Sequence, residues 1–259
     1  MADLESIAAE LLRAYGRSEP TLAPLTSTYD GLTVDDAYAI QLLQIRRRLD
    51  RGAAIVGFKV GLTSAAMQQQ MGVYEPDFGH LLTDMLHAAD DPVDTTEFRQ
   101  PRAEPEIALI LSRDLRGPGL SVADVIGATA YALPAIEIID SRITDWKIGL
   151  IDTIADNASS GGLVLGQSPV PVGTSDLSLA GCVFRRNGRI MATGAGAAVL
   201  GSPWHAATWL ANSLTARGAT LAAGSIILTG SITASIPVTA GDAFTVTVDG
   251  LGSTTAVFD

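Results

Sequence analysis

The chain has 259 residues, of which 47% are hydrophobic, enough to bury a sizeable core as one large domain or as one domain with a small appendage. Its 17 basic residues stand against 28 acidic ones, which gives a net charge of −11. That balance argues against a nucleic-acid-binding surface and against binding to an anionic membrane, because both favour basic patches. A small anionic substrate would need a local cation.

The N-terminus and the single cysteine bear on the cellular compartment. The first six residues lack the basic start and apolar core of a signal peptide, and no apolar run is long enough to span a bilayer. The sequence therefore predicts a cytoplasmic protein. Cys182 has no second cysteine with which to form an intrachain disulfide, and its apolar neighbours Val183 and Phe184 indicate a buried structural thiol.

Two helices are predicted in the first fifth of the chain. Apolar residues recur at helical spacing within residues 3–16, and a proline-containing linker follows at 20–24. Thr33 is a good N-cap for a second helix, which runs through Leu49. We interpret the arginines at 46–48 as the solvated face of that helix near its C-terminus, where cations suit the helix dipole.

A short strand is predicted at 53–63, where Lys59 is the one cation among apolar residues and glycines. Because a buried lysine is uncommon unless it is paired, a functional role competes with a structural salt bridge. A short helix through Gln70 comes next, followed by a stretch with turn composition at 73–80. Within that predicted loop, Asp77 is either a turn-forming residue or a tuned base.

Three acidic residues enter apolar runs later in the chain. Glu104 and Glu106 are two residues apart, and in an extended chain such side chains share one face, where they repel unless one takes a proton or both meet a cation. Glu137, between isoleucines on a second predicted strand, has the same problem. With no cysteine or histidine nearby, these carboxylates are typical of a Mg²⁺ or Mn²⁺ site rather than a zinc site. The alternative is that Arg102 and Arg142 form salt bridges with the glutamates.

The second half of the chain turns largely to strands. A helix capped by Ser121 is predicted through about Leu133, and the small polar residues and glycines at 152–162 suit either backbone donors beside an anion or a plain loop. Asn187-Gly marks a two-residue hairpin, and one further helix is predicted within 202–218. Helices early and strands late predict an α+β chain with a mixed or antiparallel core.

Six segments contain the residues singled out above, and they occur in one order along nearly the whole chain. They lie at 57–64, 75–80, 101–108, 133–143, 152–161 and 227–231. This set resembles the 2-oxopent-4-enoate hydratases, which belong with the oxalocrotonate decarboxylases in the fumarylacetoacetate hydrolase superfamily. Six ordered motifs together are specific where any one of them would be weak.

The resemblance implies a small helical N-terminal region, residues 1–55, packed on a mixed β-roll catalytic domain, residues 56–259, in a homo-oligomer. It also implies a divalent metal, Mg²⁺ or Mn²⁺, and a small anionic 2-oxo acid substrate. The implied site residues are the metal ligands Glu104, Glu106 and Glu137, the catalytic pair Lys59 and Asp77, and substrate contacts from Lys59, Leu62 and Ser160.

Within the superfamily, the resemblance favours a hydratase that turns 2-hydroxypenta-2,4-dienoate or a homologue into a 4-hydroxy-2-oxo acid in meta-cleavage catabolism of aromatic compounds or steroids. Related decarboxylases often carry an apolar residue where Asp77 stands, whereas His80 and the run from Ile232 resemble both groups. The alternatives are a 4-oxalocrotonate decarboxylase, a non-catalytic 2-oxo acid-binding protein and a partner in a complex of pathway enzymes. The intact acids and lysine argue against the last two.

Overall fold

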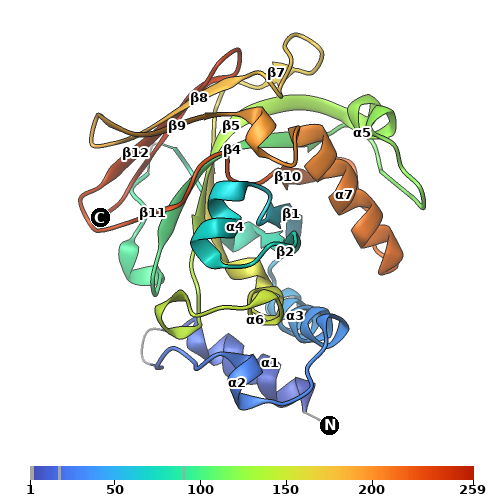
Figure 1. Cartoon of the computed structure of the whole chain (residues 1–259), viewed down its shortest axis with the longest axis vertical. Helices are drawn as coiled ribbons and strands as arrows, with labels where there is room; N and C mark the ends of the chain where they lie inside the picture. Colours follow the sequence, from blue (N-terminus) through green and yellow to red (C-terminus); the bar gives the residue numbers. More distant parts are fainter. Residues whose placement is uncertain (1–2, 17–18, 90) are drawn as a thin grey trace.

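The N-terminal part of the chain is helical, as predicted. The computed structural model describes residues 3–16, 19–89 and 91–259. Helices α1 (Leu4–Ala14), α2 (Leu25–Thr28) and α3 (Val34–Leu49) gather at one end of the molecule, where α1 packs against α3 (Figure 1). Thr33 and Asp36 form a reciprocal capping box at the start of α3, so the predicted N-cap is confirmed. The short α2 was not predicted and follows the linker.

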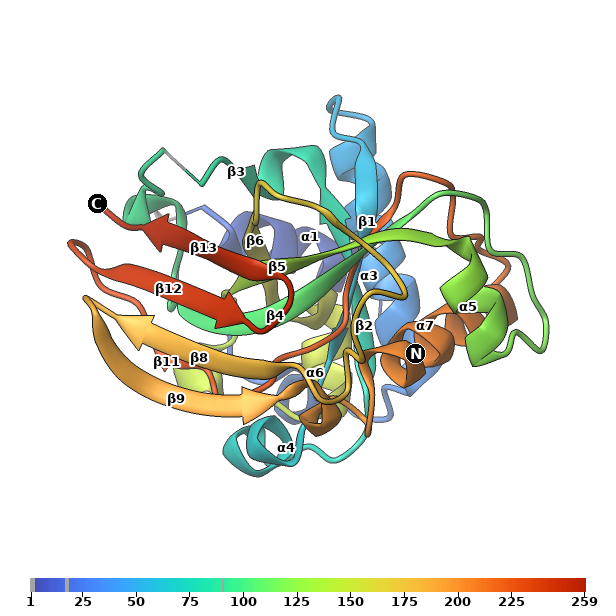
Figure 2. The same ribbon diagram turned by 90° about the horizontal axis from the view of Figure 1, so that it is seen from above.

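A curled nine-stranded sheet occupies the middle of the molecule (Figure 2). Its main path runs β2-β1-β10-β4-β5-β6-β3, with β11 paired to β4 and β7 paired to β5. The pairs β1–β10 and β3–β6 are parallel and the others are antiparallel, so the sheet is mixed. Its strands are β1 (Ile55–Gly61), β2 (Asp77–Leu82), β3 (Leu86–His87), β4 (Arg102–Leu111), β5 (Thr129–Ile139), β6 (Ser160–Leu165), β7 (Val170–Pro171), β10 (Ile226–Leu228) and β11 (Ile236–Pro237).

A smaller antiparallel sheet, in the order β13-β12-β8-β9, packs on the large one through β12 and β13. Its strands are β8 (Gly181–Arg186), β9 (Arg189–Ala195), β12 (Ala243–Val248) and β13 (Gly252–Val257). The predicted hairpin between β8 and β9 is confirmed, because Asn187 and Gly188 both have the positive φ that such a tight turn requires. Phe184 and Phe244 stack in the core with ring centroids 5.4 Å apart.

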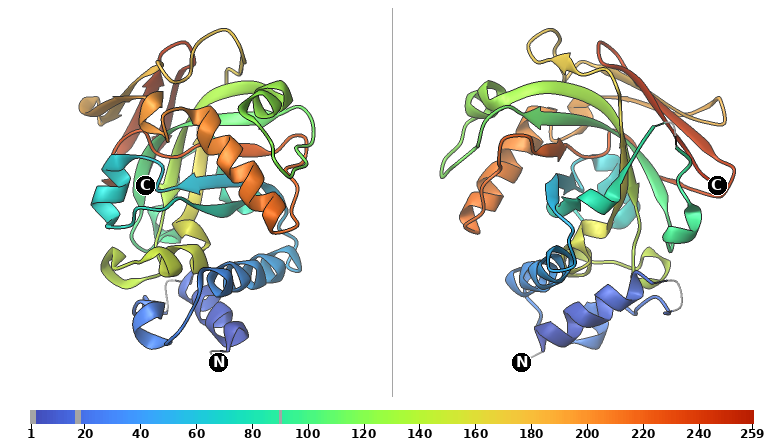
Figure 3. Two further views of the ribbon diagram at one scale, coloured as in Figure 1. Left: turned by 45° about the vertical axis from the view of Figure 1, so that its right-hand side comes forward. Right: turned by 180° about the vertical axis from the view of Figure 1, so that it is seen from behind.

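The remaining helices cover the large sheet. Figure 3 shows α7 lying across it beside α5, with the N-terminal helices at the end far from the small sheet. The helix α6 packs against both α3 and β2. These helices are α4 (Ala65–Met71), α5 (Val122–Ala128), α6 (Leu150–Ala155) and α7 (Pro203–Ala216), with 3₁₀ turns at η1 (Thr83–Met85), η2 (Thr95–Glu97), η3 (Thr144–Trp146), η4 (Asn157–Ser159) and η5 (Gly196–Ala198).

The helix that begins after Ser121 is shorter than predicted. It ends at Ala128 rather than at Leu133, and the chain enters β5 directly. Pro134 gives the physical reason, because a proline disfavours the helical conformation of the residue before it and lacks the N–H that a helix interior needs. The segment instead pairs with β4 along almost its whole length.

Two segments with turn or loop composition contain regular structure. The stretch at 73–80 turns only as far as Pro76, and Asp77 begins the buried strand β2, which pairs with β1. The polar run at 152–162 contains the end of α6, the turn η4 and the start of β6. At the starts of β2 and β6 the local composition is overridden by pairing with another strand.

The α+β class and the helical region on a mixed β-roll are confirmed. The division at residue 55 stays a prediction. The arginines at 46–48 lie near the end of α3, where Arg47 pairs with Glu5 and Arg48 with Asp84. Cys182 is buried, and burial raises the pKa of its thiol to about 12, as expected of a structural residue. Within the described ranges, each helix is too short or too polar to cross a bilayer.

Candidate active site

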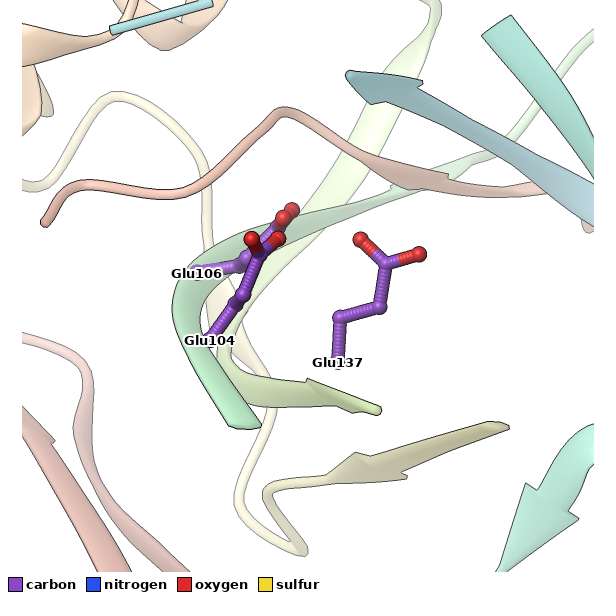
Figure 4. A group of neighbouring side chains, drawn as sticks. All are labelled: Glu104, Glu106 and Glu137. Atoms are coloured by element: carbon purple, nitrogen blue, oxygen red, sulfur yellow. The ribbon is translucent and has the colours of Figure 1, made fainter. Parts of the chain in front are cut away.

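Three buried glutamates meet on one face of the large sheet. Glu104 and Glu106 alternate along β4, and Glu137 lies directly opposite Glu104 on β5, so their side chains point to the same side. Each offers a carboxylate oxygen, and these oxygens lie within 4.8 Å of one another. Figure 4 shows the side chains converging from the two strands. The spacing in the sequence thus puts two acids in one site, and the neighbouring strand supplies the third.

Most oxygens of this cluster lack a hydrogen-bond donor. The N–H of Gly230 donates to Glu106 Oε2 at 2.8 Å. Glu104 Oε1, Glu106 Oε1 and both oxygens of Glu137 accept no hydrogen bond from the described residues. Lys59 Nζ lies 3.4 Å from Glu137 Oε1, an ion pair longer than a strong hydrogen bond. Buried carboxylate oxygens are costly without a partner, so this donor set fits a hard divalent cation.

The alternative salt bridges to arginine are not what the structure shows. Arg142 is fully buried, and its Nε donates to Asp156 Oδ1 at 2.6 Å. Arg102 donates from Nε to Ser235 Oγ at 2.7 Å and also to the carbonyl of that residue. Both guanidinium groups are therefore engaged elsewhere, and Lys59 is the cation that pairs with the cluster.

Burial makes the carboxylates of this cluster hard to ionise. Burial, followed by repulsion from Glu137, raises the pKa of Glu104 to about 8, and the same causes raise the pKa of Glu106 well above its ordinary value. Burial also raises the pKa of Glu137, against the opposing attraction of Lys59. Burial disfavours charged Lys59, but the surrounding carboxylates, led by Glu137, outweigh it and raise the pKa of the lysine. The cluster therefore needs protons or a metal ion to balance its charge.

We expect Mg²⁺ to bind more tightly as the pH rises from about 6 to about 9. In the metal-free protein the pKa of Glu104 is raised from 4.5 to about 8, so at the lower pH the metal must displace a proton. As the pH rises through 8 this carboxylate ionises, and its share of the competition falls. Calorimetric titration in buffers with different heats of ionisation measures both the affinity and the protons released. An affinity independent of pH, with no proton release, would contradict this expectation.

Lys59 and Asp77 reach the same space from the antiparallel strands β1 and β2. Lys59 and Gly61 share a face of β1, and Asp77 lies opposite Gly61. A Cβ at Gly61 would stand 2.1 Å from Asp77 Oδ1 and 3.4 Å from Lys59 Nζ, so the absent side chain makes room for both groups. Both residues are buried. Asp77 is therefore no loop residue but the first residue of a buried strand.

The two carboxylate oxygens of Asp77 differ in their hydrogen bonding. Oδ2 accepts a hydrogen bond from Thr153 Oγ1 at 3.0 Å, whereas Oδ1 accepts none from the described residues. Burial raises the pKa of Asp77, while the charge of Lys59 and then the hydroxyl of Thr153 oppose that rise. One oxygen is thus anchored, and the other is available to a water or a substrate.

Lys59 and Asp77 line a pocket that they share with apolar side chains. Its lining combines the charged side chains of Lys59, Asp77 and Glu104 with apolar side chains such as that of Leu62. Its other lining residues are Gly61, Met67, Met71, Ile139, Trp146, Ile148, Thr153, Ala158, Ser159 and Ser231. A carboxylate-bearing molecule with a short hydrocarbon chain suits this combination of charged and apolar side chains.

Ser160, expected to contact the substrate, lies beside the pocket rather than in its lining. Its side chain is fully buried, and its Oγ has no hydrogen-bond partner among the described residues. The preceding residues Ala158 and Ser159 line the pocket instead, in a left-handed turn with φ of 51° and 54°. Such φ values are strained for residues with a side chain and need firm support from their surroundings.

Sequence reasoning missed several residues of the pocket. Thr153 lies inside one of the six motifs, but nothing in the sequence indicated its bond to an acid 76 positions away. Met67 and Met71 follow the predicted N-cap of α4 at helical spacing, so they could have been assigned to one face of that helix. Trp146, in the short turn η3, carried no comparable signal.

The fold and this site define a known class of protein. The family described as fumarylacetoacetate (FAA) hydrolase C-terminal matches residues 55–258, and the chain belongs to that family. The superfamily assignment predicted from the six motifs is thereby confirmed.

Within this class, two relatives and one solved structure show what the chain is similar to. It is 43% identical over 255 residues to the 2-keto-4-pentenoate hydratase of Paraburkholderia xenovorans (strain LB400), covering 98% of this chain and 94% of that one. It is 42% identical over 263 residues to the 2-hydroxyhexa-2,4-dienoate hydratase of Comamonas testosteroni, covering 100% and 99%. The 4-oxalocrotonate decarboxylase from Pseudomonas putida G7, complexed with magnesium and adipate, superposes with a TM-score of 0.93 at 39% identity, covering 99% and 97%.

Proposed function

We propose that this chain is a hydratase that adds water to 2-hydroxypenta-2,4-dienoate, or a homologue, to give a 4-hydroxy-2-oxo acid. The observation that carries the proposal is the cluster of buried carboxylates beside Lys59 and Asp77. Relatives that are 43% and 42% identical, with 94% and 99% of their length covered, are named hydratases of such dienoates or their keto forms, which supports the same reaction here. Pathways that cleave aromatic or steroid rings at the meta position produce substrates of this kind.

Glu104, Glu106 and Glu137 would hold a divalent metal, Mg²⁺ or Mn²⁺. Their unpaired oxygens and the absence of nitrogen or sulfur donors among them support this choice. When bound, such a metal would supply positive charge that stabilises negative charge on the carboxylate and 2-oxygen of the substrate.

The remaining groups of the pocket bind the substrate and move protons. Lys59 neutralises the substrate carboxylate or shuttles a proton, and Asp77 orients or deprotonates the attacking water through its free Oδ1. Leu62 packs against the hydrocarbon chain. The contact between Ser160 and the substrate stays a prediction, and its buried Oγ, which has no hydrogen-bond partner among the described residues, is the group that would make it.

The proposed reaction adds one water and balances its protons. Carbon C5 of the dienol takes a proton while the 2-hydroxyl loses one, which gives the conjugated 2-oxo-3-enoate. Water then adds through its oxygen at C4 and releases a proton, and C3 takes a proton. Asp77 suits the water-adding step, because it is a buried acid whose free Oδ1 could take the proton that the attacking water releases.

The second candidate is a decarboxylase that acts on 2-oxohex-3-enedioate. The similarity to the 4-oxalocrotonate decarboxylase structure favours it. Against it stands the acid at position 77 in the pocket, because a negative side chain opposes binding of a second carboxylate. The hydratases are also more similar in sequence.

A direct assay separates these candidates. We expect purified protein with Mg²⁺ to consume 2-hydroxypenta-2,4-dienoate, measured as loss of its ultraviolet absorbance with formation of the 4-hydroxy-2-oxo acid. It should release little CO₂ from 2-oxohex-3-enedioate, and chelation should stop the hydration until metal is restored. Rapid CO₂ release with the dienoate left unhydrated would establish the decarboxylase. Turnover of neither compound would leave a 2-oxo acid-binding protein.

Two expectations about assembly stay predictions. The resemblance implies a homo-oligomer, and the exposed apolar side chains of Ile190 and Met191 on the outer strand β9 offer one surface for it. The second of these predictions is a complex with other enzymes of the pathway.

A further inference from the structure

Thr153 makes an unusual hydrogen bond for a threonine in a helix. Such a hydroxyl commonly donates to the carbonyl one turn earlier in its own helix, as Thr208 does to the carbonyl of Trp204 at 2.7 Å in α7. Thr153, in α6, instead donates to Asp77 Oδ2 at 3.0 Å, across 76 positions of sequence. Both partners are buried and line the pocket, so this bond lies beside the reacting groups.

A single buried glutamine fixes the two segments that carry this pair. Gln41, on α3, donates from Nε2 to the carbonyl of Phe78 at 3.0 Å and to the carbonyl of Ile154 at 2.8 Å. These are the residues that follow Asp77 and Thr153. Gln41 is fully buried, and the neighbouring Gln44 donates in the same way to the carbonyl of Ala155 at 2.7 Å. The helical N-terminal region thereby holds α6 in register with β2.

The other oxygen of Asp77 has no hydrogen bond within the described part of the chain that fixes its position. Oδ1 lies 2.1 Å from the position that a Cβ of Gly61 would take, and it accepts no hydrogen bond from the described residues. The final torsion of an aspartate side chain is broad, so an unanchored carboxylate can turn within such a space. Anchoring Oδ2 is therefore what keeps Oδ1 directed toward the pocket.

We propose that Thr153 is a positioning residue for Asp77, kept in register by Gln41. The hydroxyl fixes the rotation of the carboxylate and donates to its ionised form. This inference rests on the proposed function, in which Asp77 acts on water. The hydroxyl of Thr153 differs from a merely structural hydrogen-bond donor, because its removal would affect hydration only through Asp77.

The test compares T153V with T153S in purified, Mg²⁺-loaded protein. Valine keeps the volume of threonine and removes the donor, so we expect kcat for hydration to fall about 10- to 100-fold, in proportion to the loss of a hydrogen bond to a charged group. T153S keeps the hydroxyl and should retain kcat within about threefold. T208V, the same change at a helical threonine outside the pocket lining, should leave kcat unchanged.

A double-mutant cycle makes the inference specific. In the D77N background, T153V should lower the residual kcat less than about twofold, because the two residues act as a unit. A full further loss in that background would overturn the proposal, as would wild-type kcat in T153V or an equal loss in T153S. Should T153V not fold, T153A replaces it in the same cycle.

Crystal structures of the metal-free variants supply a readout independent of activity. The Asp77 carboxylate should be rotated in T153V and unchanged in T153S. An unrotated carboxylate in T153V would overturn the positioning role even if hydration fell. A wild-type protein that turns over no dienoate would refute the proposed function, while the rotation in T153V would still decide the role of Thr153.

Discussion

Glu106→Gln is expected to weaken Mg²⁺ binding by more than about a hundredfold while the protein stays folded. Loss of groups that merely support a metal ligand already costs about 10- to 100-fold, and Glu106 is itself a candidate ligand. Glutamine keeps the volume, and its amide oxygen can still accept the hydrogen bond from Gly230. The change removes one negative charge from a cluster in which burial and repulsion already oppose ionisation.

The measurement is calorimetric titration of the metal-free variant with Mg²⁺ at about pH 9, above the raised pKa of wild-type Glu104. Thermal unfolding checks the fold. We expect the metal-free variant to be no less stable than the metal-free wild type, because a buried acid has been neutralised. Glu97→Gln changes an exposed glutamate in the same way and should leave Mg²⁺ affinity unaltered. Wild-type affinity in Glu106→Gln would show that this residue is not a ligand.

Local sequence patterns predicted much of the fold. The cap of α3, the hairpin at Asn187 and the strand that carries the two glutamates follow from residue types at fixed spacing, which act over a few positions. The predicted start of β2 was wrong because pairing with β1 decided it, and the predicted end of α5 was wrong because Pro134 and pairing with β4 favour a strand there. Turn composition before Asp77 is a local signal, and it was outweighed by a strand that lies about 20 positions earlier.

The candidate site also combines residues that local spacing could place with residues that only strand pairing brings together. Glu104 and Glu106 could be placed together from their alternation on one strand. Their meeting with Glu137 depends on the register of β4 against β5, and the meeting of Asp77 with Lys59 on the register of β1 against β2. A shift of one residue in either register would send those side chains to the opposite face. The family resemblance supplied these long-range relations, which spacing alone does not contain.

Asp77→Asn is expected to lower kcat for hydration by about 10²- to 10⁴-fold, the range for loss of a group that transfers a proton in the transition state. Asparagine has nearly the same shape, so it can still accept the hydrogen bond from Thr153 and still fit against Gly61. It cannot take a proton from water. Mg²⁺ affinity should change far less, because Asp77 lies outside the glutamate cluster.

Asp77→Asn also tests why this pocket would favour a monoacid. An ionised acid about 5 Å from a second substrate carboxylate would oppose its binding by about 3 kcal/mol at an effective dielectric constant of about 20. Neutralising that acid should therefore lower the inhibition constant of a saturated dicarboxylate by up to about a hundredfold, even as hydration is lost. Steady-state inhibition of the wild type and equilibrium binding to both proteins measure the two effects.

Asp249→Asn, at an exposed turn that also tolerates asparagine before glycine, is the matched control and should alter neither. If Asp77→Asn hydrates the dienoate at the wild-type rate, another group must activate the water; if it also binds the dicarboxylate no better, the charge at this position does not select the substrate.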